Sequence, residues 1–132
     1  MTKNSNNFSS ARPRFQAENI LRCFNDKFSY IYKYLSKELG PVAFNVIEKC
    51  WEETKPHLSY LFQEAKITSS GRIDLSPLLK TNLVNTDQKV QLNIIKDLNE
   101  LLVAEVLTSR KNLGSEHEAL LVKNLEKIGE ES

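Results

Sequence analysis

The residues best suited to metal or thiol chemistry are two cysteines and two histidines, which lie far apart in the chain: Cys23, Cys50, His57 and His117. Zinc sites usually draw their ligands from closely spaced pairs of such residues. Cys50 and His57 are separated by Pro56, which interrupts the helical spacing that would bring them to one face. We therefore expect no metal site, and we expect both cysteines to be reduced thiols, mostly buried among apolar neighbours.

A second candidate for metal binding is the stretch TSSGRIDLSPLL, residues 68–79, which combines a glycine with several oxygen-bearing side chains. When Gly71 is aligned with the turn glycine of an EF-hand loop, Ile73 falls on the family's aliphatic position and Asp74 on one of its ligand positions. In these residues the stretch resembles the calcium-binding loop of the EF-hand family.

The same alignment departs from the EF-hand pattern at its two most important ligands. Lys66 falls on the first ligand position, and Pro77 falls on the position of the bidentate carboxylate. A cation in one place and a missing carboxylate in the other exclude a high-affinity calcium site, so none of the family's ligands is assigned. The stretch is predicted to be a glycine-centred turn at Gly71, with Ile73 packed into the core.

Acid-base and phosphoryl-transfer chemistry are disfavoured by the surroundings of the ionisable residues. His117 lies between Glu116 and Glu118, whose charges would repel a phosphorylated histidine. Glu52 and Glu53 fall on a polar helix face and lack the desolvated surroundings that catalytic carboxylates need. The sequence contains no phosphate-binding glycine loop, dinucleotide fingerprint or nucleophile elbow. We expect a protein that is not an enzyme and that uses no cofactor.

The charge balance argues against a nucleic-acid partner. The chain has 18 Lys and Arg residues against 17 Asp and Glu residues, so no overall field attracts a polyanion. Gln88 and Lys89 could begin the reading helix of a helix-turn-helix, but the continuation is apolar and carries Asp97, Glu100 and Glu105. This segment is therefore predicted to be a buried helix, and nucleic-acid binding is not expected.

The hydropathy pattern predicts a soluble protein without membrane insertion. The opening residues MTKNSNNFSS lack an apolar stretch of the length that a secretory signal requires. No unbroken aliphatic run is longer than that of Leu101 to Ala104, which is far shorter than a membrane span. We expect a cytoplasmic location.

Apolar residues recur at helical spacing along most of the chain and predict an all-α fold. Residues 1–12 are polar, without periodicity, and are predicted to be a disordered tail, whereas residues 13–132 are predicted to form a single helical domain. No segment alternates with a period of two, so no strand is predicted. The domain is predicted to be a compact bundle of about six helices, over Arg14 to Leu39, 43 to about 55, 56–66, 77 to about 84, 87 to about 112, and 115 to about 128.

Capping residues predict where several of these helices begin and end. Gly40, followed by proline, is expected to end the first helix, and Asp87 is expected to cap the start of the fifth. Gly114 can adopt the left-handed conformation that ends the fifth helix, and Gly129 is expected to end the last one. The helix over 87–112 is apolar on nearly every side in its LLVAEVL portion, which predicts that it lies at the centre of the core.

The first helix carries more aromatic side chains than one buried stripe can absorb. Four of them are candidates for an interface with a partner: Phe24, Tyr30, Tyr32 and Tyr34. Tyrosine combines an apolar ring with a polar hydroxyl and is favoured at protein interfaces. The alternative is that these rings cover the edge of the core, with their hydroxyl groups in water.

These patterns favour a non-catalytic regulatory or protein-interaction module with a role in signalling or complex assembly. Its partner would be another protein or a second copy of the chain in a homodimer. The alternative is a helical sensor domain that binds an apolar small molecule in its core. Such a cavity would be lined by aromatic residues at helical spacing, namely Phe44, Trp51, Tyr60 and Phe62.

Overall fold

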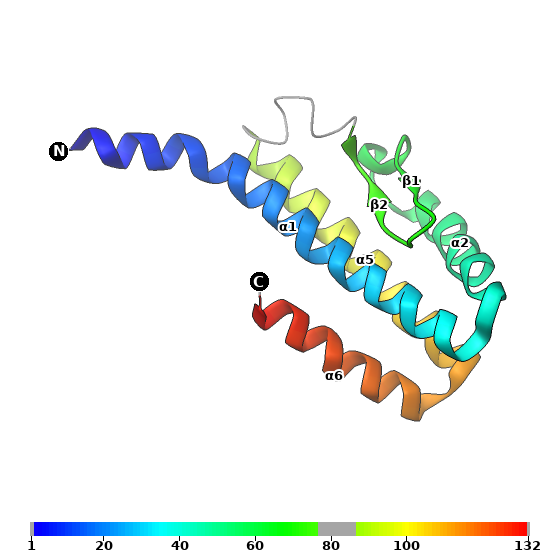
Figure 1. The fold of residues 1–132 in the computed structure, drawn as a ribbon. Helices are drawn as coiled ribbons and strands as arrows, with labels where there is room; N and C mark the ends of the chain where they lie inside the picture. Colours follow the sequence, from blue (N-terminus) through cyan, green and yellow to red (C-terminus); the bar gives the residue numbers. More distant parts are fainter. Residues whose placement is uncertain (1, 77–86, 132) are drawn as a thin grey trace.

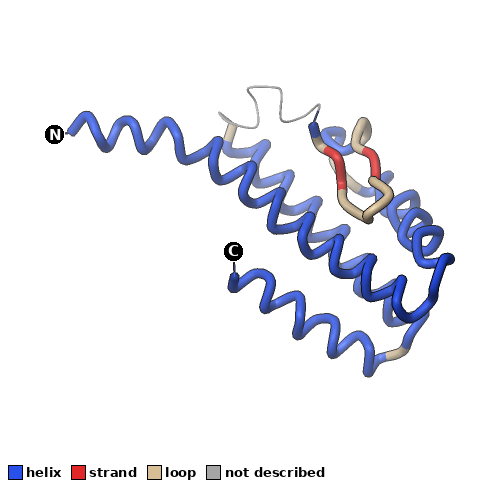
Figure 2. The backbone as a smooth tube through the Cα atoms, in the orientation of Figure 1, coloured by secondary structure: helices blue, strands red, loops and turns tan. Residues whose placement is uncertain are grey.

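Four α-helices, three short 3₁₀ turns and one short β-hairpin make up the described part of the chain, residues 2–76 and 87–131 of a computed structural model (Figure 1). The elements are α1 (Thr2–Leu39), α2 (Ala43–Thr54), β1 (Lys66–Ile67), β2 (Ile73–Asp74), α5 (Gln88–Leu113) and α6 (Ser115–Glu131). Helix accounts for most of the backbone, and the chain forms a single compact unit (Figure 2). The predicted all-α class is therefore confirmed.

The predicted number of about six helices is wrong. The stretch 56–66, predicted to be a helix, instead contains the end of the 3₁₀ turn Lys55–His57, the whole of the 3₁₀ turn Tyr60–Phe62 and the start of β1. The helix predicted from 77 to about 84 lies outside the described residues.

Local backbone chemistry explains why no α-helix forms after α2. Pro56 supplies no backbone N–H for a helical hydrogen bond. Leu58 and Ser59 then turn the chain out of the helical conformation, with ψ angles of 165° and 168°. Leu61 and Phe62 are nevertheless buried. The apolar spacing in this segment therefore identified core residues correctly, although it did not indicate a helix.

The hairpin of β1 and β2 corrects the expectation that the chain contains no strand. Lys66 pairs with Asp74 and Ile67 with Ile73 in an antiparallel ladder. Because each strand has two residues, neither could display an alternating pattern. Gly71 provides the turn with a φ of 82°, and Ile73 is buried, as predicted.

One side chain of α1 fastens the hairpin to the helical part of the molecule. The Asn25 amide oxygen accepts a hydrogen bond of 2.8 Å from the Ile73 backbone N–H. Its amide nitrogen donates one of 3.1 Å to the Ile73 backbone oxygen. Asn25 therefore occupies both hydrogen-bonding groups of Ile73 and holds the hairpin against α1.

The capping residues behave as predicted at three of the four positions. Gly40 follows the last residue of α1, with a φ of 74°, and Gly114 separates α5 from α6, with a φ of 103°. The Asp87 carboxylate accepts hydrogen bonds from the first backbone N–H groups of α5. The prediction for Gly129 is wrong, because α6 continues to Glu131.

α1 begins at Thr2, well before the start at Arg14 that the apolar spacing predicts. Its first turns project beyond the ends of the other helices in Figure 1. The polar stretch 1–12 was expected to be disordered. From its second residue onward, its backbone is instead helical. The division into a tail over 1–12 and a domain over 13–132 stays a prediction.

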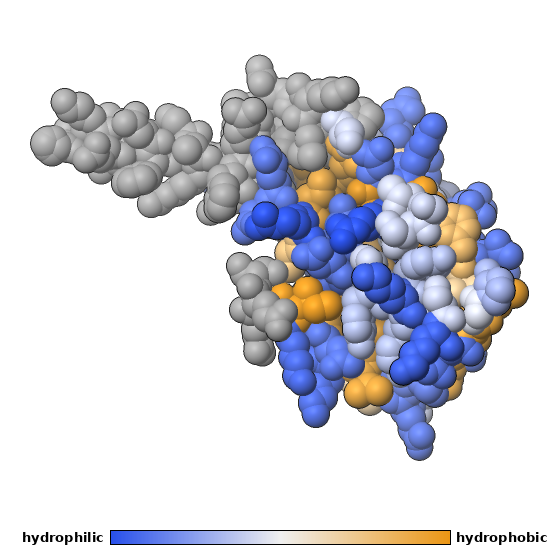
Figure 3. Space-filling model, viewed as in Figure 1, coloured by the Kyte–Doolittle hydropathy of each residue, from blue (hydrophilic) through white to orange (hydrophobic). Residues whose placement is uncertain are grey.

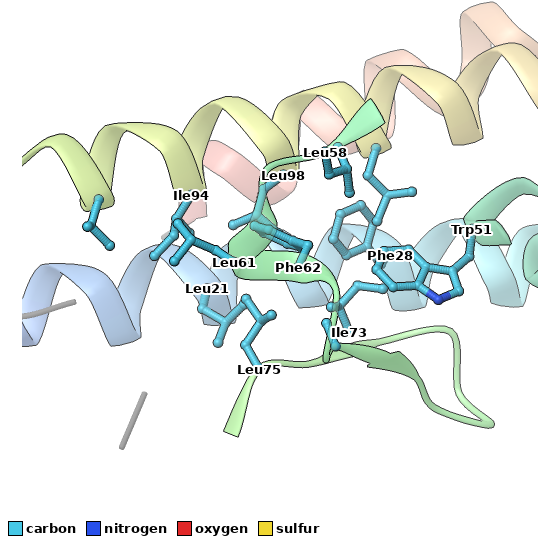
Figure 4. Close-up of a cluster of buried hydrophobic side chains, with 13 residues drawn as sticks. Leu21, Phe28, Trp51, Leu58, Leu61, Phe62, Ile73, Leu75, Ile94 and Leu98 are labelled. Atoms are coloured by element: carbon cyan, nitrogen blue, oxygen red, sulfur yellow. The ribbon is translucent and has the colours of Figure 1, made fainter. Parts of the chain in front are cut away.

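The first apolar cluster lies where α1, α5 and the non-helical segment meet (Figure 4). Phe28 of α1 and Phe62 of the 3₁₀ turn Tyr60–Phe62 are fully buried, and Leu98 of α5 is as well. Ile73 and Leu75 extend the cluster to the hairpin. Burial of this apolar surface is the main force that holds the irregular segment on the helices.

The second apolar cluster joins the opposite end of the bundle. It contains Ile31 and Leu35 of α1, Ile47 of α2, and Leu121 and Leu125 of α6. Leu102 and Val106 of α5 pack against it. α5 therefore reaches both clusters, as α1 does, and its place at the centre of the core stays a prediction.

Candidate functional site

Two of the predicted interface residues join α1 to α6. The Tyr34 hydroxyl oxygen lies 2.9 Å from Nδ1 of His117, and the two rings meet edge to face. The Tyr30 hydroxyl accepts a 2.7 Å hydrogen bond from the Asn124 amide. Desolvation, together with the charge of Glu38, raises the pKa of Tyr34 above its ordinary value. Both hydroxyls serve contacts within the chain, and an interface role for the two tyrosines stays a prediction.

The other two predicted interface residues, Phe24 and Tyr32, also contact neighbouring elements. Phe24 packs against the first cluster, 6.2 Å from Phe28 between ring centroids. Tyr32 meets the Phe44 ring of α2 edge to face. A Cβ atom at Gly71 would lie 2.7 Å from the Tyr32 Cβ, so the turn needs glycine in order to approach α1. Both aromatic rings are partly exposed, and their use by a partner stays a prediction.

The four residues expected to line a sensor cavity do not converge. Trp51 and Phe62 belong to the first cluster as packed core residues. Phe44 packs on Tyr32, and Tyr60 is exposed. The structure therefore gives these residues ordinary packing or surface positions, and a ligand cavity would have to lie elsewhere.

An open apolar groove lies between α5 and α6, with a volume of about 380 Å³. Three of the side chains that line it are unusually exposed for their type: Val103 at 57%, Leu107 at 46% and Val122 at 38%. Figure 3 shows hydrophobic side chains at the surface among charged ones in the region of α6. The apolar lining consists of Leu102, Val103, Val106, Leu107, Val122 and Leu125.

The sequence contained a signal for this groove that the search for chemistry did not use. The LLVAEVL segment of α5 was recognised as apolar on nearly every side, which exceeds what one buried face can take. The surplus side chains, Val103 and Leu107, point into the groove lining instead of the core. The position of α6 beside them depends on tertiary packing and could not be derived from local spacing.

Charged side chains border the groove. Lys27 of α1 and two residues of α6, Glu118 and Glu126, complete its lining. Arg110 of α5 lies 3.8 Å from Glu118, an ion pair that is open to solvent and therefore weak. The groove thus has an apolar floor with a mixed charged border, the arrangement found at protein-binding surfaces.

Two carboxylates on the buried face of α5 form the second feature of interest. The Asp97 side chain is 4% exposed and accepts hydrogen bonds from the Ser59 backbone N–H at 3.1 Å and from the Ser59 hydroxyl at 2.5 Å. Glu105 is fully buried, and neither of its carboxylate oxygens has a hydrogen-bond partner among the described residues. Burial raises the pKa of Glu105 well above its ordinary value.

The thiol of Cys50 lies near Glu105 in the α2–α5 interface. Burial raises its pKa, and the charge of Glu105 acts in the same direction. Hydrogen bonds from the side chains of Thr108 and Thr54 act in the opposite sense without reversing the shift. A thiol with a raised pKa is a poor nucleophile at neutral pH, so Cys50 has the character of a packed core residue.

The remaining candidates for chemistry stay separate in space. Neither Cys23 nor Cys50 forms a disulfide, and Cys50 is buried, whereas Cys23 is only partly buried. Within residues 2–76 and 87–131, no three side chains of His, Cys, Asp or Glu come together in a way that could hold a metal ion. In the same residues, no helix combines the length and apolar character that crossing a membrane would require.

Comparisons with known protein families, with curated proteins and with solved structures find no match for this chain.

Proposed function

We propose that the chain is a non-catalytic interaction module that pairs with a second copy of itself through the groove between α5 and α6. The observation that carries this proposal is the exposure of Val103, Leu107 and Val122 along one apolar groove. Water contact with this surface is unfavourable, at roughly 25 cal/mol for each Å² of apolar area. A partner that covers the groove removes that cost.

A second copy suits the shape of this surface. The groove and its exposed aliphatic side chains lie on the same face, and a two-fold axis brings a surface patch against itself. Val103 and Leu107 of one protomer then lie on the α6 side of the partner's groove, and Val122 lies on its α5 side. The apolar lining of each copy is covered by the other.

The charges of the two helices also favour this pairing. A two-fold axis that runs through the groove sets α5 of one protomer across from α6 of the other. The exposed charges of α5 are mostly basic: Lys89, Lys96, Arg110 and Lys111 against Glu100. Those of α6 within the described residues are balanced, Glu116 and Glu126 against Lys123 and Lys127, and the half-buried Glu118 adds one more acid at the groove border. Opposite charges at such a border steer association and set its register more than they strengthen it.

The test is the molar mass of the purified protein by light scattering over a dilution series. We expect the mass of two chains at high concentration and a transition to one chain on dilution. Leu107→Glu and Val122→Glu each place a charge in the groove and are expected to weaken association by at least about tenfold, or 1.4 kcal/mol.

Leu92→Glu is the matched control for these variants. Leu92 is also on α5 and is 63% exposed, but it does not line the groove. Its variant should dimerise like the wild type, and circular dichroism should show unchanged helicity in all three variants. A single-chain mass at every concentration, or equal weakening by Leu92→Glu, would refute the proposed pairing.

A role in signalling or in complex assembly in the cytoplasm remains part of this proposal. The alternative function, a sensor of an apolar small molecule, is favoured by one observation. The volume of the groove, about 380 Å³, lies within the range of small-molecule sites. Native mass spectrometry of protein from its own host separates the two functions, because a sensor retains a ligand mass, whereas the homodimer carries none.

A further inference from the structure

Glu105 occupies a position that ionised carboxylates rarely tolerate. Its side chain is fully buried, and both oxygens lack a hydrogen-bond partner in the part of the chain that the structure describes. A buried charge without a partner is strongly unfavourable, and a group in this position normally becomes neutral instead. Native proteins contain few unsatisfied buried groups, and each of them calls for a specific explanation.

The hydroxyl groups nearest in sequence and space have other partners. The Ser109 hydroxyl is buried and donates a hydrogen bond of 2.9 Å to the backbone oxygen of Glu105, not to its carboxylate. The side chains of Thr54 and Thr108 form hydrogen bonds with Cys50. Three hydroxyl groups and a thiol thus gather in the α2–α5 interface without satisfying the acid among them.

No charge from the neighbouring helices compensates Glu105. Leu102 and Val106, within one turn of it on α5, pack against the second apolar cluster, which α1, α2 and α6 form. Burial alone raises its pKa, and no cation among the described side chains lowers it.

The ionisable groups on the helices packed against α5 offer no counter-charge. From α2 the facing group is the Cys50 thiol, and the nearby Glu53 carries the same charge as an ionised Glu105. From α1, Lys27 lines the α5–α6 groove but does not lower the pKa of Glu105, and Tyr34 is paired with His117 of α6. The other charged groups of α6 in that groove, Glu118 and Glu126, carry the same charge as an ionised Glu105. Ionisation of Glu105 would therefore place an uncompensated negative charge inside the closed bundle.

We propose that Glu105 is a proton-operated latch between α5 and α2, which keeps the two helices closed while the carboxyl group is neutral and releases α2 when the group ionises. α2 is suited to move as a unit. It has 12 residues and is bounded by the 3₁₀ turns Gly40–Val42 and Lys55–His57. Gly40 lies at the first of these turns with a φ of 74°, a conformation that residues with a side chain rarely adopt.

The direction of the pH effect follows from proton linkage. The closed bundle binds the Glu105 proton more tightly than the open form, in which the group has its ordinary pKa of 4.5. Opening therefore releases a proton, and the closed form is favoured fully below that pH. As the pH rises toward the raised pKa of the closed form, the opening equilibrium increases by up to about tenfold for each pH unit.

The labelling rate of Cys50 measures this opening in the full chain. Cys50 is buried in the closed interface and becomes reachable by iodoacetamide when α2 moves away. In a Cys23→Ser background it is the one remaining cysteine of the chain. The rate is compared with that of the same background carrying Glu105→Gln, whose side chain has the same shape and cannot ionise.

The ratio of the two rates removes the ordinary pH dependence of thiol alkylation. We expect this ratio to rise by at least tenfold from about pH 5 to pH 8, because only the chain with Glu105 opens as the pH rises. Hydrogen exchange of the wild type needs no variant. Over the same pH range, the exchange rate of the α2 amides should increase more than that of the α6 amides. A constant ratio, or an equal increase of exchange in both helices, would overturn the latch.

Discussion

Asp97 and Glu105 lie on the same buried face of α5, about two turns apart, and use the same functional group in opposite ways. Asp97 receives two hydrogen bonds from Ser59 and fixes the point at which the chain leaves its helical conformation. Glu105 receives none, although it is fully buried in the α2–α5 interface near the Cys50 thiol. Burial alone therefore does not determine whether a carboxylate stabilises the fold. The presence of hydrogen-bond donors from another element does.

The largest expected effect is the loss of stability when the satisfied carboxylate is removed. Asp97→Ala leaves the Ser59 backbone N–H and hydroxyl without their acceptor in a partly buried site, which should lower the free energy of unfolding by about 2–3 kcal/mol. Urea denaturation followed by circular dichroism measures this change. Ser59→Ala removes only the hydroxyl contact and should lower stability by about 1 kcal/mol. Equal stability of Asp97→Ala and the wild type would show that these hydrogen bonds fix no structure.

The opposite sign is expected for the unsatisfied carboxylate. Glu105→Leu replaces a buried polar group by an apolar one and should raise the free energy of unfolding by about 1–3 kcal/mol at pH 8. The gain should shrink toward pH 5, because the folded wild type binds its proton there and that cost of ionisation is absent. Denaturation at the two pH values measures the difference. A pH-independent gain would mean that packing, rather than ionisation, distinguishes the two side chains.

The sequence was sufficient to predict where the helices lie, but it was insufficient to predict which buried polar residues find a hydrogen-bond partner. Apolar residues at helical spacing located α1, α2, α5 and α6, and Asp87 and Gly114 marked the ends of α5. Periodicity cannot show whether a polar residue on a buried face finds a partner. The partner of Asp97 is Ser59, which lies in a segment that the same periodicity assigned to a helix.

The candidate sites depend on contacts that are remote in sequence. The tyrosines of α1 were recognised as aromatic groups with polar tips, but Asn124 and His117, their partners, lie on α6. The α5–α6 groove forms because Gly114 reverses the chain and brings Val122 beside Val103. Local propensity predicts such a turn. Which side chains the turn brings into contact depends on how the whole helices pack, and local propensity does not predict that.

The smallest expected effect concerns a polar contact that is satisfied but only partly buried. Tyr34→Phe removes the hydroxyl that meets His117 Nδ1, and it should lower the free energy of unfolding by about 0.5–1 kcal/mol. The effect should be smaller than that of Asp97→Ala, because Tyr34 and His117 are both partly exposed and water can replace the lost partner there. Hydrogen exchange of α6 locates the change, since this contact links α6 to α1. If Tyr34→Phe were as costly as Asp97→Ala, burial would matter less than the number of donors, and the contrast between Asp97 and Glu105 would need another explanation.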